Sequence, residues 1–156
     1  MEASVFKMTH EQSLQQNGYT VCSPISGSMK PLIRPNVDSA VFVPPEKIRK
    51  YDVALYRREG QAIMHRVVGF RGEDTLIRGD NSSYTETVPR RDIFGVMQGF
   101  YRGKRYVAAD SLGYRLFSRC WVAMAPLLPL IKKIYHFLRK ISSEFFCAFT
   151  FRSMLS

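Results

Sequence analysis

Two serine hydroxyls stand two residues apart in the stretch Ser26-Gly27-Ser28, and a histidine, His65, follows in an apolar run. A serine hydroxyl is a poor nucleophile near neutral pH and needs a neighbouring base to take its proton as it attacks a carbonyl carbon. Histidine suits this task because its ordinary pKa of about 6.5 leaves a large neutral fraction near pH 7. These residue types indicate acyl-transfer chemistry if the fold brings them together.

The serines lie in a segment that resists regular structure. Gly27 permits backbone angles closed to other residues, while Pro24 and Pro31 lack an N–H group and disfavour helix in the residue before them. We expect an irregular loop after a short strand at 19–23, and such loops often carry nucleophiles. The alternative interpretation is a turn whose hydroxyls only cap backbone groups.

Five short stretches in this order resemble motifs of the type I signal peptidases, and of the serine endopeptidase superfamily that groups them with the SOS-repressor proteases. They are SGSMKP at 26–31, NVDSAV at 36–41, KYDVALY at 50–56, MHRVVG at 64–69 and RGDN at 78–81. The resemblance implies that Ser28 is the nucleophile and His65 the general base. Most bacterial members have lysine at the position of the base, so the chain resembles the histidine-type variant of the endoplasmic reticulum, archaea and some spore-forming bacteria.

Two of the acids that follow His65 are candidates for the carboxylate that holds a catalytic imidazole and stabilises its charged form. The resemblance implies that Glu86, six positions after the turn aspartate Asp80, orients the histidine, although the family has Asp there. Asp80 is the other candidate; alternatively it holds the turn together. For the oxyanion, the resemblance implies the backbone N–H of Ser28 and the hydroxyl of Ser26 as donors.

The middle of the chain has the pattern of a β protein. Short β-prone runs separated by turn residues predict strands at 39–43, 53–57, 62–70, 75–78 and 93–101. We therefore expect a mainly β fold, with a coiled, partly barrel-like antiparallel sheet. The expected organisation is a polar N-terminal segment at 1–18 with a short helix, a β-rich peptidase domain at 19–109 and a helical, basic amphipathic extension at 110–156.

The expected extension begins with a helix capped by Asp110 or Ser111 and ending near 125, after which Pro126 and Pro129 mark a break. Apolar residues then recur alternately every four and every three positions from 127 to 148, which predicts one face of a second helix. Residues 102–156 contain 10 Lys and Arg against 2 Asp and Glu, whereas residues 1–101 contain 13 against 11.

A basic amphipathic helix suits an anionic membrane surface, which we expect to be contacted through 126–150. The alternatives are that its apolar face packs on the β domain or on a second copy of the chain, giving a homo-oligomer. Residues 1–18 show neither a signal peptide nor a membrane anchor, so the expected location is peripheral at a membrane or cytoplasmic. Aromatic and basic residues do not alternate in the predicted strands as in single-strand binders, so no specific nucleic acid is expected.

The overall composition is that of a folded protein, with 46% hydrophobic and 23% charged residues and a net charge of +10. Cys22, Cys120 and Cys147 are odd in number and lack metal-ligand spacing, so they indicate neither a disulfide framework nor a zinc site. No metal or organic cofactor is implied.

The function predicted from the sequence is a serine endopeptidase that cleaves a leader or signal-like peptide in an extended conformation. One alternative is a catalytically silent binding module that works through its basic C-terminal extension. The other is an autocleaving regulator, for which residues 1–18 are too few to form a helix-turn-helix and His65 replaces the expected lysine.

Overall fold

The computed structural model describes residues 9–127, 129–130 and 133. Its strands are β1 (Thr20–Cys22), β2 (Ser39–Val43), β3 (Val53–Arg58), β4 (Gln61–Arg71), β5 (Asp74–Arg78), β6 (Glu86–Pro89), β7 (Ile93–Arg102) and β8 (Arg105–Ala108). The α-helices are α1 (His10–Asn17) and α2 (Leu112–Met124), and the short 3-10 helices are η1 (Gly27–Met29), η2 (Arg90–Asp92) and η3 (Ala125–Leu127).

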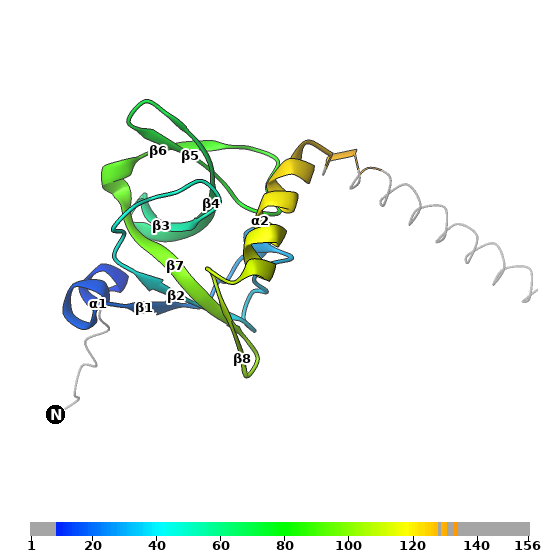
Figure 1. Ribbon diagram of the computed structural model, residues 1–156. Coiled ribbons are helices and arrows are strands. Elements are labelled where there is room, and N and C mark those ends of the chain that lie inside the picture. Colours follow the sequence, from blue (N-terminus) through cyan, green and yellow to red (C-terminus); the bar gives the residue numbers. More distant parts are fainter. Residues whose placement is uncertain (1–8, 128, 131–132, 134–156) are drawn as a thin grey trace, which may run out of the picture. The chain divides into compact units, whose positions relative to one another are not determined.

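The described strands form one antiparallel sheet in the order β1-β2-β7-β3-β4-β5-β6, with β8 paired to β7 (Figure 1). The register shifts within the pairs β2–β7, β3–β7 and β4–β5. Such irregularities bend a strand and increase its twist, which is how the sheet coils. The sheet does not close into a barrel, and the predicted mainly β, coiled, partly barrel-like antiparallel fold is confirmed.

Every strand predicted from the sequence is present, with ends that differ by no more than one residue. Two described strands, β6 and β8, were not predicted. β6 is a four-residue strand that ends in Pro89 and pairs with β5, and β8 follows a tight turn in which Gly103 has a φ of 62°. Both are too short for an alternation of apolar and polar residues to stand out.

Two clusters of buried side chains fix the parts of the sheet that matter for the site. Met29 and Ile33, which follow the two serines, are fully buried in one cluster together with Phe42. The second cluster includes Val67 and Ile77, on the strands β4 and β5. Burial of apolar side chains on both sides therefore anchors the serine loop and the strand that carries His65.

The helix α1 confirms the short helix expected within residues 1–18. Thr9 and Gln12 form a reciprocal capping box at its start, and Gly18 ends it in the left-handed conformation with a φ of 75°.

The helix α2 lies where it was predicted. The Ser111 carbonyl accepts the N–H of Arg115, but the Ser111 hydroxyl donates to the Ala108 carbonyl at 2.7 Å and does not cap the helix. The compact unit that contains the sheet runs to Ala123, so nearly all of α2 belongs to it. The predicted second helix lies almost wholly outside the described residues, as does most of the segment 126–150 that was expected to contact a membrane. None of the helices within the described ranges is long and apolar enough to cross a bilayer.

Candidate functional site

Ser28 lies in η1 and Ser26 immediately before it, in the segment that follows β1. The Ser28 hydroxyl lies 3.1 Å from that of Ser26, close enough for a hydrogen bond. Ser26 is exposed and Ser28 partly exposed, whereas Met29 next to them is fully buried. Burial of Met29 in the core thus anchors the loop, while the Ser26 and Ser28 hydroxyls stay accessible. The predicted irregular loop contains one short 3-10 turn.

The turn after β5 is tied directly to this loop. The backbone N–H of Asn81 donates to the Ser28 carbonyl at 2.7 Å, and the Asn81 side-chain amide donates to the Gly27 carbonyl at 3.3 Å. A methyl group at Gly79 would come within 2.9 Å of the Ser28 carbonyl oxygen and 3.1 Å of Nε2 of His65. The lack of a side chain at Gly79 therefore lets the serine loop and the imidazole approach the same small space.

His65 lies in the middle of β4, opposite Ala54 of β3, and only 4% of its surface is exposed. Burial lowers the pKa of His65 below its ordinary value because the charged imidazolium loses water, while the negative charge of Glu86 opposes this shift. The net effect keeps His65 neutral near pH 7. One of its nitrogens is then free to accept a proton.

The other ring nitrogen, Nδ1, faces a hydroxyl and a carboxylate. The Tyr56 hydroxyl is 3.1 Å from Nδ1 and also donates to Oε2 of Glu86 at 3.1 Å. Oε1 of Glu86 lies 3.4 Å from Nδ1, is buried and has no hydrogen-bond partner of good geometry. With the single Tyr56 proton directed to Glu86, we assign the imidazole proton to Nδ1, from which the Tyr56 oxygen accepts. This arrangement leaves Nε2, on the side of Gly79, without a proton.

Glu86 is also held from outside. It begins β6, and Arg58 on β3 donates from Nη1 to its Oε2 at 2.8 Å. Tyr56 is itself buried, and burial together with the neighbouring Glu86 charge raises its pKa, so its hydroxyl keeps its proton. Tyr56 and Arg58 thus hold the Glu86 carboxylate at the Nδ1 edge of the imidazole, on the side away from Nε2.

Asp80, the other candidate acid, is engaged elsewhere. Its carboxylate forms a two-point ion pair with Arg66, with both N–O distances 2.7 Å, and the two side chains are 2% and 1% exposed. Burial works against the charged Arg66, but the Asp80 hydrogen bonds and charge outweigh it and raise the pKa of Arg66. The Asp80 carbonyl accepts the Trp121 indole N–H at 3.0 Å. Asp80 thus connects the turn to β4 and α2.

The structure therefore places the Ser28 carbonyl and Nε2 of His65 beside Gly79, the Ser26 hydroxyl beside that of Ser28, and Glu86 at Nδ1 of His65. Among the described residues, the Ser28 hydroxyl bonds to Ser26 and not to His65. Asp80 lies in the turn with its carboxylate on Arg66. Sequence reasoning missed Tyr56 and Arg58. A signal for them was present, because alternate residues of a strand point to one face and the β3–β4 hairpin pairs Ala54 with His65. Tyr56 and Arg58 follow Ala54 on that face.

A scan against protein-family models and a search of curated proteins both gave no match. The likeness to signal peptidases therefore rests on the five short sequence motifs alone.

Proposed function

We propose that the protein is a serine endopeptidase of the signal peptidase type, with Ser28 as nucleophile and His65 as general base. The observation that carries this proposal is the hydrogen-bond arrangement on Nδ1 of His65. Tyr56 and Glu86 occupy that nitrogen, and the neutral tautomer presents an unprotonated Nε2 toward the space shared with the serine loop. This is the tautomer that a serine nucleophile requires of its base.

In the proposed reaction, Ser28 Oγ attacks the carbonyl carbon of a peptide bond as its proton passes to Nε2. Glu86 stabilises the imidazolium through Nδ1, and the Ser28 N–H and Ser26 hydroxyl donate to the oxyanion. His65 then gives its proton to the leaving amine as the C–N bond breaks. A water molecule, deprotonated by the same nitrogen, cleaves the acyl-enzyme and restores Ser28.

The Ser26 hydroxyl has a geometric reason for this role, since it already lies within hydrogen-bond distance of Ser28 Oγ in the free protein. An oxyanion that forms on the carbon attacked by Ser28 Oγ develops next to that hydroxyl. Ser26 is exposed, so a substrate carbonyl can reach it from solvent.

The proposed substrate is a leader or signal-like peptide in an extended conformation, with small side chains near the cleaved bond. The edge strand β1 leads straight into the serine loop, so an extended peptide could run beside it. We further propose a peripheral location, in which the basic segment 126–150 holds the enzyme at an anionic membrane surface.

The decisive experiment uses a serine-directed acylating probe and intact-protein mass measurement. Wild type should gain one acyl group, which Ser28→Ala should not, while Ser23→Ala should label as wild type does because the Ser23 hydroxyl is paired with that of Ser39. Cleavage of a signal-like peptide should fall to near background in both Ser28→Ala and His65→Ala. Labelling or cleavage by Ser28→Ala at the wild-type level would refute the assignment.

A further inference from the structure

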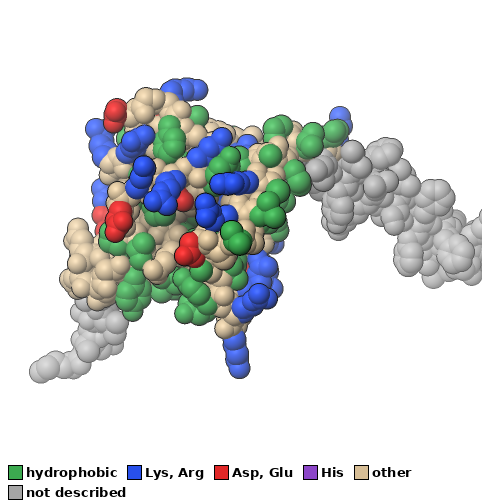
Figure 2. Space-filling model, viewed as in Figure 1, with side chains coloured by type: hydrophobic (Ala, Val, Ile, Leu, Met, Phe, Trp, Pro, Cys, Tyr) green, Lys and Arg blue, Asp and Glu red, His purple; other side chains and the backbone are tan. Residues whose placement is uncertain are grey.

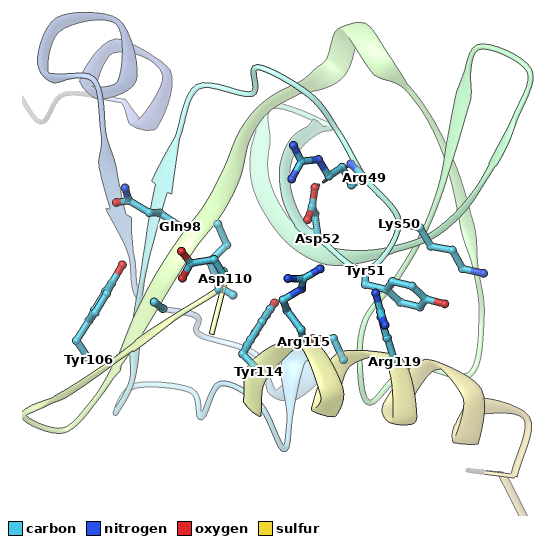
Figure 3. A pocket seen from close by; sticks show the side chains of 14 residues that line it. Arg49, Lys50, Tyr51, Asp52, Gln98, Tyr106, Asp110, Tyr114, Arg115 and Arg119 are labelled. Atoms are coloured by element: carbon cyan, nitrogen blue, oxygen red, sulfur yellow. Dashed lines mark hydrogen bonds between the residues drawn. The ribbon is translucent and has the colours of Figure 1, made fainter. Parts of the chain in front are cut away.

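A pocket of about 770 Å³ opens between the chain segment 49–52, the strands β7 and β8, and one side of α2 (Figure 3). Its lining includes neither Ser28 nor His65. The volume falls in the range of pockets that hold small ligands, roughly 300 to 1,000 Å³. The proposed peptidase chemistry gives this pocket no role.

Four cationic side chains line the pocket. Arg49 and Lys50 come from the segment before β3, and Arg115 and Arg119 come from successive turns of α2, on the same side of the helix. Lys and Arg side chains gather on this face of the molecule, where the sheet meets α2 (Figure 2). All four are exposed, and within the described part of the chain none of them forms an ion pair.

Two carboxylates, Asp52 and Asp110, also line the pocket, so its side chains carry a net charge of +2. The Asp52 carboxylate already has a hydrogen-bond partner, since its Oδ2 accepts the backbone N–H of Arg49 at 2.8 Å. Asp110 is exposed. The acids reduce the positive charge of the pocket and do not neutralise it.

The inner wall of the pocket is polar and hydrogen-bonded to Arg66. Tyr114 and Ser118 of α2 are buried, and their hydroxyls accept hydrogen bonds from Nη1 of Arg66 at 3.3 and 2.8 Å. The same Nη1 donates to the carbonyl of Tyr51 at 2.9 Å. Arg66 thereby fixes α2 against the segment that carries Arg49 and Lys50, so the two pairs of cations face one opening without a ligand to hold them.

We propose that this pocket binds a phosphate group, supplied by the headgroup of an anionic phospholipid or by a small phosphorylated compound. A guanidinium matches phosphate oxygens with two parallel hydrogen bonds, and three of the four cations are arginines. A phosphate monoester carries a charge of about −1.5 to −2 near pH 7, which balances the excess of the pocket, and the phosphodiester of a lipid headgroup, with a charge of about −1, balances half of it. This inference does not depend on the proposed peptidase activity.

The test measures binding of inorganic pyrophosphate to the full chain by calorimetry at constant ionic strength. The same proteins are then floated with vesicles of phosphatidylcholine alone, and with vesicles that contain phosphatidylglycerol in equal amount. The pocket variant is Arg115→Gln/Arg119→Gln, and the control variant is Arg71→Gln/Arg91→Gln. The control removes the same charge from exposed arginines outside the pocket. Equal melting temperatures of the two variants verify that both are folded.

We expect saturable binding by wild type and the control, weakened roughly tenfold for each arginine lost in the pocket variant. A difference between the variants with pyrophosphate assigns the pocket to small phosphorylated compounds. A difference that appears only with phosphatidylglycerol vesicles assigns it to a lipid headgroup. If wild type binds neither probe, or if the two variants bind both probes equally, the pocket is not a phosphate site.

Discussion

Arg66 and Asp80 face each other as a buried two-point ion pair, and this pair joins the strand that carries His65 to the turn that borders Ser28. Three further acceptors, on Tyr51, Tyr114 and Ser118, complete the guanidinium's hydrogen bonds. A buried charge is tolerated only when it is paired in this way. The pair therefore supports the geometry of the site, and the charge of Asp80 also acts on His65 by opposing the lowering of its pKa.

Replacing Asp80 by asparagine should destabilise the fold. The amide preserves the shape of the side chain but leaves the Arg66 charge buried without its partner, which costs about 3 kcal/mol. Urea unfolding should measure this loss of stability. A peptide-cleavage assay should show reduced activity of the same variant. Glu73→Gln removes an exposed carboxylate near the other end of β5 and should leave the unfolding midpoint unchanged. A stable but inactive Asp80→Asn would instead identify Asp80 as the acid that acts on His65.

Glu86→Gln should have the opposite profile. The amide keeps most of the packing, but it no longer stabilises a protonated His65 across the 3.4 Å between Nδ1 and Oε1. We expect peptide turnover to fall at least roughly tenfold with little change in melting temperature. Glu86→Asp retains the charge and should keep substantial activity. Full activity of Glu86→Gln in a steady-state cleavage assay would remove Glu86 from the mechanism.

Tyr56→Phe removes the hydroxyl that contacts both His65 and Glu86. The buried ring remains, so the stability loss should be only about 1 kcal/mol, while Nδ1 of His65 loses its best-placed acceptor. Turnover should fall about three- to tenfold as the tautomer with the proton on Nε2 becomes populated. Imidazole ¹⁵N chemical shifts of His65 measure that tautomer directly. Unchanged shifts would show that Tyr56 supports the packing alone.

The pH dependence follows from the burial of His65. Because its pKa is lowered, activity should rise with pH through one limb that lies below the ordinary histidine value of about 6.5. Glu86→Gln removes a charge that favours the imidazolium, so its limb should move to lower pH. A limb two or more pH units above 6.5 would indicate a lysine base. The same depressed pKa means that stability, fully present above about pH 6.5, declines as the pH falls through the folded-state value.

Removing residues 126–156 tests the basic segment, which carries much of the positive charge of the second part of the chain. The truncated protein should bind vesicles containing phosphatidylglycerol more weakly and still cleave a short soluble peptide. Undiminished flotation with the vesicles would contradict a membrane role for the segment. Loss of the folded sheet, detected by circular dichroism, would show that the apolar residues of 127–148 belong to the core.

The parts of the fold that could be predicted are those with a local signal. Strands such as Ser39–Val43 and Ile93–Arg102 alternate or cluster apolar residues between turn residues, and that pattern reports burial directly. The β6 strand has only Val88 buried, and it forms because β5 offers an unpaired edge beside it. The backbone of the preceding strand β5 pairs with this segment, and the four residues of β6 carry no pattern of their own that could predict a strand.

The residues of the candidate site also differ in how far the sequence could predict them. The motif order singled out Ser28, His65 and Glu86 as candidates, but the choice between Glu86 and Asp80 as the acid beside His65 could not be made from their spacing. It depended on Arg66, which follows His65 in the chain and points to the opposite face of the strand. That arginine binds the aspartate and leaves the glutamate to the histidine, an outcome that only the folded register reveals.

Gly79 gives a simple criterion for reading other chains of this kind. Any larger residue there would push against the Ser28 carbonyl and the His65 ring at once, at distances of 2.9 to 3.2 Å from its first carbon. Under the proposed mechanism, a chain that kept the serine, the histidine and the whole sheet would still lose activity if a methyl group at this position separated the serine loop from the imidazole. Under the same mechanism, the absence of a side chain at this position is therefore as informative, when other sequences are compared with this one, as the candidate residues around it.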